Sequence, residues 1–212
     1  MRYLIFSDTH LTPTFEPKKF AILKDAIKQV DKVIINGDFW EGYAGTFHNF
    51  VSSRWAKELF PLLKSKKAVY LFGNHDPRRL ADKRMDLFSD YQEEEFVFKS
   101  GTKTFHIMHG NRIVVFPDVS ARVRIILEFV EGIVLKIFGK LFIRLAYKRF
   151  NNYIKKKIPT IIKDDKYLIT GHTHFAEVDL ENRYLNEGFI HYGYAQYLFI
   201  EDGNVTSVEK RY

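Results

Sequence analysis

The chain has 212 residues, of which 46% are hydrophobic and none is cysteine, and its formal net charge is +7. This length and apolar content predict one folded domain over residues 1–212 and argue against a disordered chain. The lack of cysteine excludes disulfides, thiolate metal sites and a cysteine nucleophile, and it fits a reducing cytoplasm. The positive charge favours an anionic partner (nucleic acid, a phosphorylated substrate or an acidic membrane), or it is simply a soluble basic surface.

Three early segments share one pattern, a short apolar run that ends in Asp or Asn: RYLIFSD (2–8), KVIINGD (32–38) and AVYLFGNHD (68–76). The first lacks the long apolar region and cleavage site of a signal peptide, and it predicts a strand. Residues 15–30 and 47–66, which lie between these runs, have helix-like apolar spacing. This alternation predicts a largely parallel sheet, in which ligands bind beyond the carboxyl ends of the strands.

Two later strands end in the same way, KTFHIMHG (103–110) and DKYLITGHTH (165–174). From about residue 175 the chain is rich in strand-like segments, and EDGN (201–204) has the composition of a tight hairpin turn. We expect this C-terminal part to form a second, mixed sheet that packs on the first.

Residues 119–160 break the pattern and predict a helical insertion within the domain. Apolar pairs recur about every fourth residue with charges between them, which is typical of one or two amphipathic helices that end in a basic tail. The interspersed charges make this region a poor candidate for a transmembrane segment.

Polar side chains gather where the five strands end. They are Asp8, His10, Asp38, Asn74, His75, Asp76, His109, His172 and His174. A single histidine is most often structural, but five strands that deliver His, Asp or Asn to one edge predict a two-metal site. Two divalent cations about 3.5–4 Å apart can clamp a phosphoryl group and activate a water. Ligands of this kind suit Mn, Fe, Zn or Mg.

The motifs DTH, GD, GNHD, HG and GHTH, in this order between residues 8 and 174, resemble those of the calcineurin-like metallophosphoesterase superfamily. YLNEGF, near the C-terminus, resembles the NxG segment of that family. The resemblance implies an α/β fold, a four-layer metallophosphoesterase β-sandwich flanked by helices. It also implies two catalytic divalent metal ions, with Mn²⁺ as the first choice, and hydrolysis of a phosphomonoester, phosphodiester or pyrophosphate.

The resemblance also implies a role for each motif residue. Asp8, His10, Asp38 and His174 would bind one metal ion, and Asp38, Asn74, His109 and His172 would bind the other, with Asp38 bridging. Asn74 and His75 would contact the substrate phosphate, His75 would protonate the leaving oxygen, and Asp76 would orient His75. Arg78 and Arg79 follow directly, and they either hold substrate phosphate or form a solvated basic turn.

Within the superfamily, the UDP-2,3-diacylglucosamine hydrolases are similar in layout. GDFWE (37–41) resembles a segment of that group, and HG is followed by a helical insertion before GHTH. This implies a lipid-linked substrate, an insertion that acts as a lid, and a cytoplasmic protein on the inner face of a membrane. His75 and Asn111 replace the usual Arg and Asp of that group, which favours the general phosphatase and phosphodiesterase pattern.

Several alternatives remain open from the sequence. Residues 121–157 either contact a lipid or membrane surface as a lid, pack on the core, or form a dimer interface. A nucleotide or nucleic-acid phosphodiesterase fits the positive charge, but no nucleic-acid-binding motif supports it. A non-catalytic scaffold would not need competent residues at every ligand position, yet all of these positions are filled.

Overall fold

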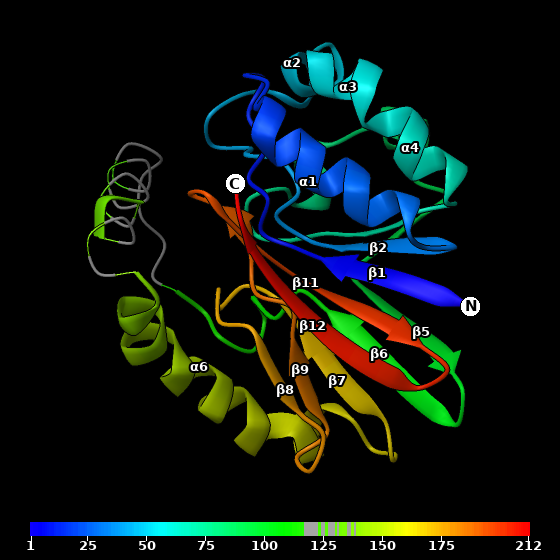
Figure 1. Ribbon diagram of the computed structural model, residues 1–212, viewed down its shortest axis with the longest axis vertical. Coiled ribbons are helices and arrows are strands. Elements are labelled where there is room, and N and C mark those ends of the chain that lie inside the picture. Colours follow the sequence, from blue (N-terminus) through cyan, green and yellow to red (C-terminus); the bar gives the residue numbers. More distant parts are fainter. Residues whose placement is uncertain (117–122, 124–125, 127–129, 131, 135–136, 138) are drawn as a thin grey trace.

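A computed structural model shows two β-sheets packed face to face, with helices on the outer face of each (Figure 1). It describes residues 1–116 and 139–212, together with 123, 126, 130, 132–134 and 137. The remaining residues of the predicted 119–160 insertion lie outside the described part. The layers follow the order helices, first sheet, second sheet, helix, which is the mixed α/β architecture predicted from the sequence.

The first sheet has the strand order β10-β11-β1-β2-β3-β4, with β12 beside β11. Its strands are β1 (Arg2–Phe6), β2 (Lys32–Asn36), β3 (Val69–Leu71), β4 (Tyr91–Glu93), β10 (Ile190–His191), β11 (Tyr194–Glu201) and β12 (Asn204–Arg211). Strands β1 to β4 run parallel, whereas β11 is antiparallel to β1. The parallel part therefore aligns the carboxyl ends of β1, β2 and β3 along one edge.

The second sheet has the order β5-β6-β7-β9-β8. Its strands are β5 (Glu95–Ser100), β6 (Lys103–Met108), β7 (Tyr167–Thr170), β8 (Glu177–Asp179) and β9 (Tyr184–Asn186). Strands β6, β7 and β9 are parallel to one another. The strands that end in MHG and GHTH thus belong to this sheet, and the edge that carries the polar residues is formed by two sheets instead of one.

The prediction that the C-terminal strands form the second sheet was only partly right. Strands β8 and β9 do join it, but β11 and β12 join the first sheet, where β11 pairs with β1. The reason is that every residue of β11 from Tyr194 to Ile200 is buried. Such a strand needs cover on both faces and neighbours on both sides, which the centre of a sheet provides. The Asp202–Gly203 turn then returns the chain as β12.

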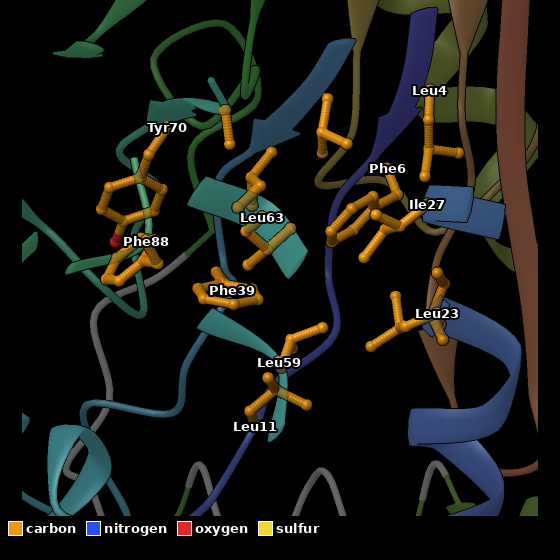
Figure 2. Packing of buried hydrophobic residues seen from close by; sticks show 14 of the residues in the cluster. Leu4, Phe6, Leu11, Leu23, Ile27, Phe39, Leu59, Leu63, Tyr70 and Phe88 are labelled. Carbon is orange, nitrogen blue, oxygen red and sulfur yellow. The ribbon is translucent and has the colours of Figure 1, made fainter. Parts of the chain in front are cut away.

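The core follows the alternation of side chains along β1. Leu4 and Phe6 face the helical layer, and Tyr3 and Ile5 face the second sheet. Figure 2 shows the helix-facing cluster, to which Leu23 and Ile27 of α1 (Pro17–Lys28) contribute. Complete burial of one such side chain is worth about 1.5–3 kcal/mol. The apolar contacts on both faces therefore fix the position of the end of β1 relative to the helical layer and to the second sheet.

Residues 47–66, which the sequence predicts as helical, form three short helices, α2 (Phe47–Val51), α3 (Arg54–Glu58) and α4 (Phe60–Ser65). The hydroxyl of Ser53 caps α3 by accepting a hydrogen bond from the Trp55 N–H. Pro61 occupies the first turn of α4, where its missing N–H costs nothing. Two short 3₁₀ turns, η1 (Arg78–Leu80) and η2 (Lys83–Leu87), follow β3.

Helix α6 (Lys140–Ile161) is the described end of the predicted insertion. Its residues Ile154 and Ile158 are buried against Leu168 and Tyr184 of the second sheet. Of the three alternatives for residues 121–157, packing on the core is therefore the one that applies to the later turns of α6. None of the described helices combines the length and apolar character needed to span a membrane.

Candidate metal centre

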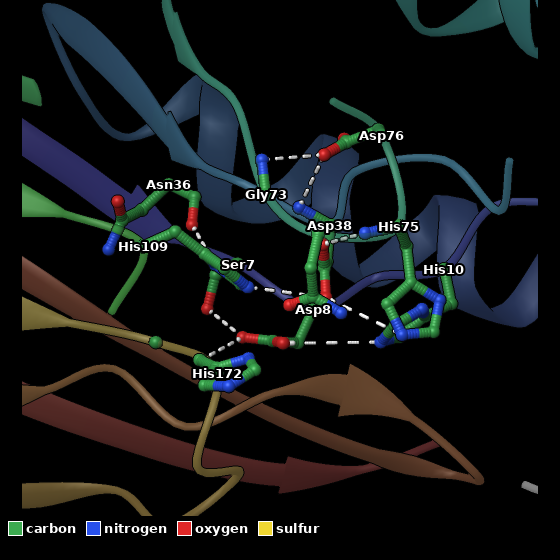
Figure 3. A network of polar contacts seen from close by, with 12 residues as sticks. Ser7, Asp8, His10, Asn36, Asp38, Gly73, His75, Asp76, His109 and His172 are labelled. Atoms are coloured by element: carbon green, nitrogen blue, oxygen red, sulfur yellow. Dashed lines mark hydrogen bonds and ion pairs between the residues drawn. The ribbon is translucent and has the colours of Figure 1, made fainter. Parts of the chain in front are cut away.

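The predicted metal ligands lie together where β1, β2 and β3 of the first sheet and β6 and β7 of the second sheet end (Figure 3). Ligand atoms of Asp8, His10 and His174 lie within 4.8 Å of one another, and so do those of Asp38, His109 and His172. A third group, His10, Asp38 and His75, overlaps with both. Asp38 therefore lies where a carboxylate can bridge two ions.

The backbone is unusual at five of these residues. Asp8, His10, Asp38, His172 and His174 all have positive φ, between 44° and 65°. A left-handed conformation costs a non-glycine residue about 1–3 kcal/mol and persists only where the surroundings enforce it. Such strain is concentrated at functional sites in proteins, and here it coincides with the predicted ligands.

Two glycines allow the GNHD and GHTH loops to lie close to the residues that follow β2 and β1. A Cβ on Gly73 would lie 2.1 Å from Oδ1 of Asp38, and a Cβ on Gly171 would lie 2.2 Å from Oγ of Ser7. Both distances are far too short for non-bonded atoms. The glycines of GNHD and GHTH are therefore needed to bring the ligand loops against β1 and β2.

The charges of the centre depend on one another. Burial would raise the pKa of Asp8, but the imidazoles of His109 and His174 outweigh it and lower that pKa to about 2. The pKa of Asp38 is well below its usual range despite burial, because of His109 and His75. Burial opposes protonation of His109, but Asp38 and Asp8 raise its pKa to about 10. The two buried carboxylates thus require cations, and metal ions would displace the proton of His109.

The available donor atoms fit divalent metal ions. Nε2 of His10, Nε2 of His109 and Oδ1 of Asn74 are buried, and within the described part they have no hydrogen-bond partner in suitable geometry. The other nitrogen of each of these imidazoles is engaged: His10 Nδ1–H donates to Glu41 Oε2 at 2.9 Å, and His109 Nδ1–H to the Asn36 carbonyl at 2.7 Å. Hydrogen bonds of this kind orient metal-binding histidines.

His172 is held in the same way, because its Nε2–H donates to the Val114 carbonyl at 2.9 Å. Burial, together with the nearby His109, lowers the pKa of His172 to about 3, so its ring stays neutral and Nδ1 keeps its lone pair. Neutral imidazole, carboxylate and amide oxygen form a donor set that suits Mn, Fe, Zn or Mg. The residues present therefore fit a pair of divalent cations.

The structure changes the predicted role of Asp76. Its buried carboxylate accepts the main-chain N–H groups of Asp38, Phe39 and Gly73 at 3.0, 2.7 and 2.8 Å. His75 Nδ1–H donates instead to Oε2 of Glu41 at 2.7 Å. Glu41, and not Asp76, thus orients His75, because the side chain of Asp76 is directed to the amides that it braces.

Sequence reasoning missed the functional placement of Glu41. The available signal was GDFWE, in which the glutamate follows Asp38 by three residues, but this segment served only to support a family resemblance. Hydrogen bonds from His10 and His75 lower the pKa of Glu41 to about 2 even though burial opposes them. One ionised carboxylate therefore orients a predicted metal ligand and the predicted acid together.

Lys19 and His191 were also missed. The side chain of Lys19 is fully buried, and its Nζ donates to the Thr9 carbonyl at 2.9 Å and to His191 Nδ1 at 3.0 Å. The ring centroid of His191 lies 5.7 Å from that of His10. A lysine within an amphipathic helix ordinarily faces solvent, so the sequence holds no signal for this arrangement.

A cavity of about 500 Å³ opens beside the centre. Asn74 and His172 line it on the side of the predicted ligands, and Arg78, Arg79 and Arg112 also contribute to its wall. Arg78 pairs with Glu93 at 2.9 Å and lies over the ring of Phe72. The two arginines predicted to hold phosphate therefore do line the space next to the ligands.

Comparison with protein-family models matches residues 1–176 to the calcineurin-like phosphoesterase family. No curated protein matches the chain. Similar solved structures include a phosphoesterase of E. coli, Yfce (TM-score 0.53, 13% identity, 98% of each chain covered), and an archaeal phosphodiesterase (0.51, 17%, 99% of this chain and 100% of the other). Vps29 of Cryptosporidium parvum is similar too (0.52, 14%, 100% and 97%). At these identities, the likeness shows a shared fold.

Proposed function

Because the chain belongs to the calcineurin-like phosphoesterase family, we propose that it is a phosphoesterase that depends on two divalent metal ions, with manganese as the first candidate. One observation carries this proposal. Two groups of ligand atoms come together around Asp38, and several of their donor atoms are buried without a hydrogen-bond partner in the described structure. Such buried groups are costly unless a cation is bound, so they favour a metal centre.

In this proposal each group of ligands holds one ion. Asp8, His10, Asp38 and His174 hold the first, and Asp38, Asn74, His109 and His172 hold the second. When bound, the ions supply positive charge to the phosphoryl oxygens and lower the pKa of water. The protein supplies the strained loops that fix the ligands and the apolar layers that hold these loops in place.

We assign protonation of the leaving oxygen to His75. Its Nδ1 is occupied by Glu41, and its Nε2 lies 3.9 Å from Oδ2 of Asp38, so the ring edge that carries Nε2 faces the centre. Glu41 thus fixes the ring so that Nε2 is directed at the centre, where a general acid must lie to reach the leaving oxygen. Asp76 acts indirectly, because it holds the backbone of Asp38 and Gly73 in place.

The cavity supports a substrate that has anionic groups beyond the one that reacts. Arg78, Arg79 and Arg112 line it, and arginine binds phosphate oxygens through paired N–H groups. Asn74 and His172 contribute to the same wall, so a phosphate held by the metal ions would reach the cavity. A pyrophosphate, or a phosphodiester or monoester that carries a further anionic group, meets this description.

The test is hydrolysis of bis-p-nitrophenyl phosphate and p-nitrophenyl phosphate by metal-stripped protein refilled with manganese. We expect turnover that depends on manganese, and the ratio of diester to monoester rates narrows the substrate class. Failure to bind any divalent ion would contradict the metal centre. Bound metal without turnover on either ester, on nucleotides or on nucleotide-linked lipids would favour a scaffold role.

A second candidate, a lipid-linked substrate at a membrane surface, is supported by the insertion. Before α6, five of its described apolar side chains are exposed, namely Val123 (43%), Ile126 (61%), Val130 (47%), Ile133 (42%) and Ile137 (67%). Their spacing of three and four residues puts them on one helical face. Together with the net charge of +7, this stripe suits contact between a cytoplasmic protein and an anionic lipid surface.

This candidate is tested by cosedimentation with anionic phospholipid vesicles. We expect the variant Ile126→Ser/Ile137→Ser to lose most of the binding without a change in its thermal unfolding. Val97→Ser, at an exposed apolar position of β5, is the control. Dimer dissociation by the same double substitution, without vesicle binding by the wild type, would indicate a dimer interface instead. Salt-sensitive binding to DNA or RNA alone would favour a nucleic-acid phosphodiesterase.

A further inference from the structure

We propose that helix α6 positions the GHTH loop (171–174), and that Asn151 is the positioning residue that carries this effect to the metal centre. The inference rests on the proposed two-metal site and goes beyond it, because it assigns a role to a residue outside every ligand motif. It also joins the predicted insertion to the reaction through its described end, α6.

The side-chain amide of Asn151 is fully buried, and all of its donors and acceptors form hydrogen bonds. Its Oδ1 accepts the hydroxyl of Thr173 at 2.5 Å and that of Tyr184 at 3.0 Å. Its Nδ2 donates to the Phe175 carbonyl and to Oε2 of Glu177, both at 2.9 Å. An amide has two donor hydrogens and two acceptor lone pairs, and all four are satisfied here. Thr173 is the residue between the two predicted histidine ligands.

Two aromatic residues of α6 reach the same loop. The ring centroid of Tyr147 lies 6.0 Å from that of His174. The ring centroid of Phe150 lies 5.2 Å from that of Phe116, which in turn lies 4.8 Å from that of His172. Positions 147, 150 and 151 share one helical face. One face of α6 therefore contacts His174 and Thr173 directly and reaches His172 through the ring of Phe116.

The helix is itself firmly anchored beyond Asn151. Nζ of Lys155 donates to Oε1 of Glu177 at 2.8 Å and to Oδ2 of Asp179 at 2.9 Å. Ile154 and Ile158 are buried in the cluster on the outer face of the second sheet. The part of α6 that contacts the loop is thus fixed relative to β7, β8 and β9.

The loop needs such support because its conformation is strained. His172 and His174 have φ values of 65° and 51°, which non-glycine residues rarely adopt. Asn186 holds the loop from inside, through bonds from its Nδ2 to the Gly171 carbonyl and to Oγ1 of Thr173, both at 3.0 Å. Asn151 supplies the acceptor on the outer side. Without it the Thr173 hydroxyl is buried with no acceptor from α6, and the loop relaxes.

The decisive comparison is between two adjacent asparagines on the same helix. Asn151→Leu removes all four hydrogen bonds at similar volume, and Asn152→Leu makes the same chemical change on the exposed face of α6. Calorimetric titration of the metal-free proteins with Mn²⁺ gives the affinity, and urea unfolding in a chelator gives the stability. We expect Asn151→Leu to weaken Mn²⁺ binding by about 10–100-fold, the usual cost of losing support around a metal ligand. Asn152→Leu should bind as the wild type does.

A purely structural role would give a different result. Asn151→Leu would then lower stability but bind Mn²⁺ with wild-type affinity, and this outcome would overturn the inference. If the wild type itself binds no divalent ion, the proposed function fails and this inference fails with it. Wild-type binding combined with equal affinity in Asn151→Leu would contradict this inference alone.

If Asn151→Leu does not fold, a second pair of variants tests the same contact from the side of Thr173. Thr173→Val removes the hydroxyl that donates to Asn151 and keeps the shape, whereas Thr173→Ser keeps the hydroxyl. We expect Thr173→Val to lose Mn²⁺ affinity and Thr173→Ser to retain clearly more of it. Equal affinities in the two Thr173 variants would overturn the inference.

Discussion

The loops GNHD (73–76) and GHTH (171–174) both follow a parallel strand and both bring histidine to the centre, but they are braced differently. In GNHD, Asp76 accepts the N–H of Gly73 within the same loop and those of Asp38 and Phe39 beside it. In GHTH, Thr173 is braced by Asn151, 22 residues earlier on α6. The GNHD loop is thus braced by its own Asp76, whereas the GHTH loop depends on α6, which ends the predicted insertion.

The largest effect should arise at Asp38, where the two halves of the centre meet. Oδ1 of Asp38 accepts the N–H of His75 at 2.8 Å, and Asp38 shares a ligand group with His109 and His172. We expect Asp38→Asn to lower manganese-dependent turnover by at least about 100-fold, the upper end of the cost of losing an outer residue of a metal site. Asp25→Asn, at an exposed position of α1, is the control. Near-native turnover in Asp38→Asn would contradict the shared ligand.

Asp76→Ala tests the GNHD loop, in which Asp76 itself accepts the N–H of Gly73. It leaves four buried main-chain N–H groups without their acceptor, each at a cost of about 1–3 kcal/mol. We expect the free energy of unfolding of the metal-free protein, measured with urea in a chelator, to fall by at least about 3 kcal/mol. Thr173→Val removes two side-chain hydrogen bonds, to Asn151 and from Asn186, and should cost less. Equal losses in the two variants would remove the distinction between the loops.

His75→Ala should separate chemistry from metal binding in the GNHD loop. We expect manganese affinity to be largely kept, and turnover to fall by about 10²–10⁴-fold for esters with poor leaving groups. Activated p-nitrophenyl esters should lose less, since their leaving oxygen hardly needs a proton. Glu41→Gln should show the same pattern more weakly, because it removes the charge beside His75 but keeps a polar partner. An equal loss on both kinds of ester would contradict the role of an acid.

The smallest expected effect concerns Glu187, which joins the support of the GHTH loop to strand β2. Glu187 lies beside Asn186, the inner brace of GHTH, and accepts a hydrogen bond from Asn36 of β2 at 2.7 Å. Burial raises the pKa of Glu187 to about 7 from its ordinary value of 4.5, although the bond from Asn36 opposes this. Between pH 4.5 and about pH 7, Glu187 is deprotonated in the unfolded chain but still protonated in the folded protein. The contribution of Glu187 to stability is therefore present below pH 4.5 and is lost as the pH rises to about 7.

Glu187→Gln removes this titration. Relative to the wild type, the metal-free variant should become more stable by up to about 3 kcal/mol between pH 4.5 and pH 8. Urea unfolding in a chelator at both pH values measures the difference. A constant difference between the two proteins would show that Glu187 does not titrate in this range.

Much of the candidate centre was predictable because each motif follows an apolar run. A buried parallel strand must end at the edge where its neighbours end, so polar residues directly after such runs converge. Asp8, Asp38 and His109 could be grouped on that basis alone. The helical layer was equally accessible, since the spacing of Leu23 and Ile27 reflects the face of α1 that packs on the sheet.

What was missed depends on contacts between residues far apart in the chain. Glu41 rather than Asp76 pairs with His75 because the Asp76 carboxylate is drawn to amides of another loop. Lys19 is buried with an ion pair to the nearby Glu16 at 2.8 Å and a hydrogen bond to His191, which lies 172 residues away. No local pattern encodes either pairing. The assignment of β6 and β7 to a second sheet likewise follows from strand pairing, which periodicity does not reveal.

The span of the centre also has a consequence for the order of folding. His174 and Asp8, whose Nε2 and Oδ1 atoms lie 3.2 Å apart, are separated by 166 residues. Closing so long a loop is slow, and it comes late in the assembly of a chain. A divalent ion would therefore meet the complete set of predicted ligands only after both sheets have formed. We expect manganese to slow unfolding and to leave the refolding rate unchanged. The metal would then stabilise the folded state without stabilising the transition state for folding.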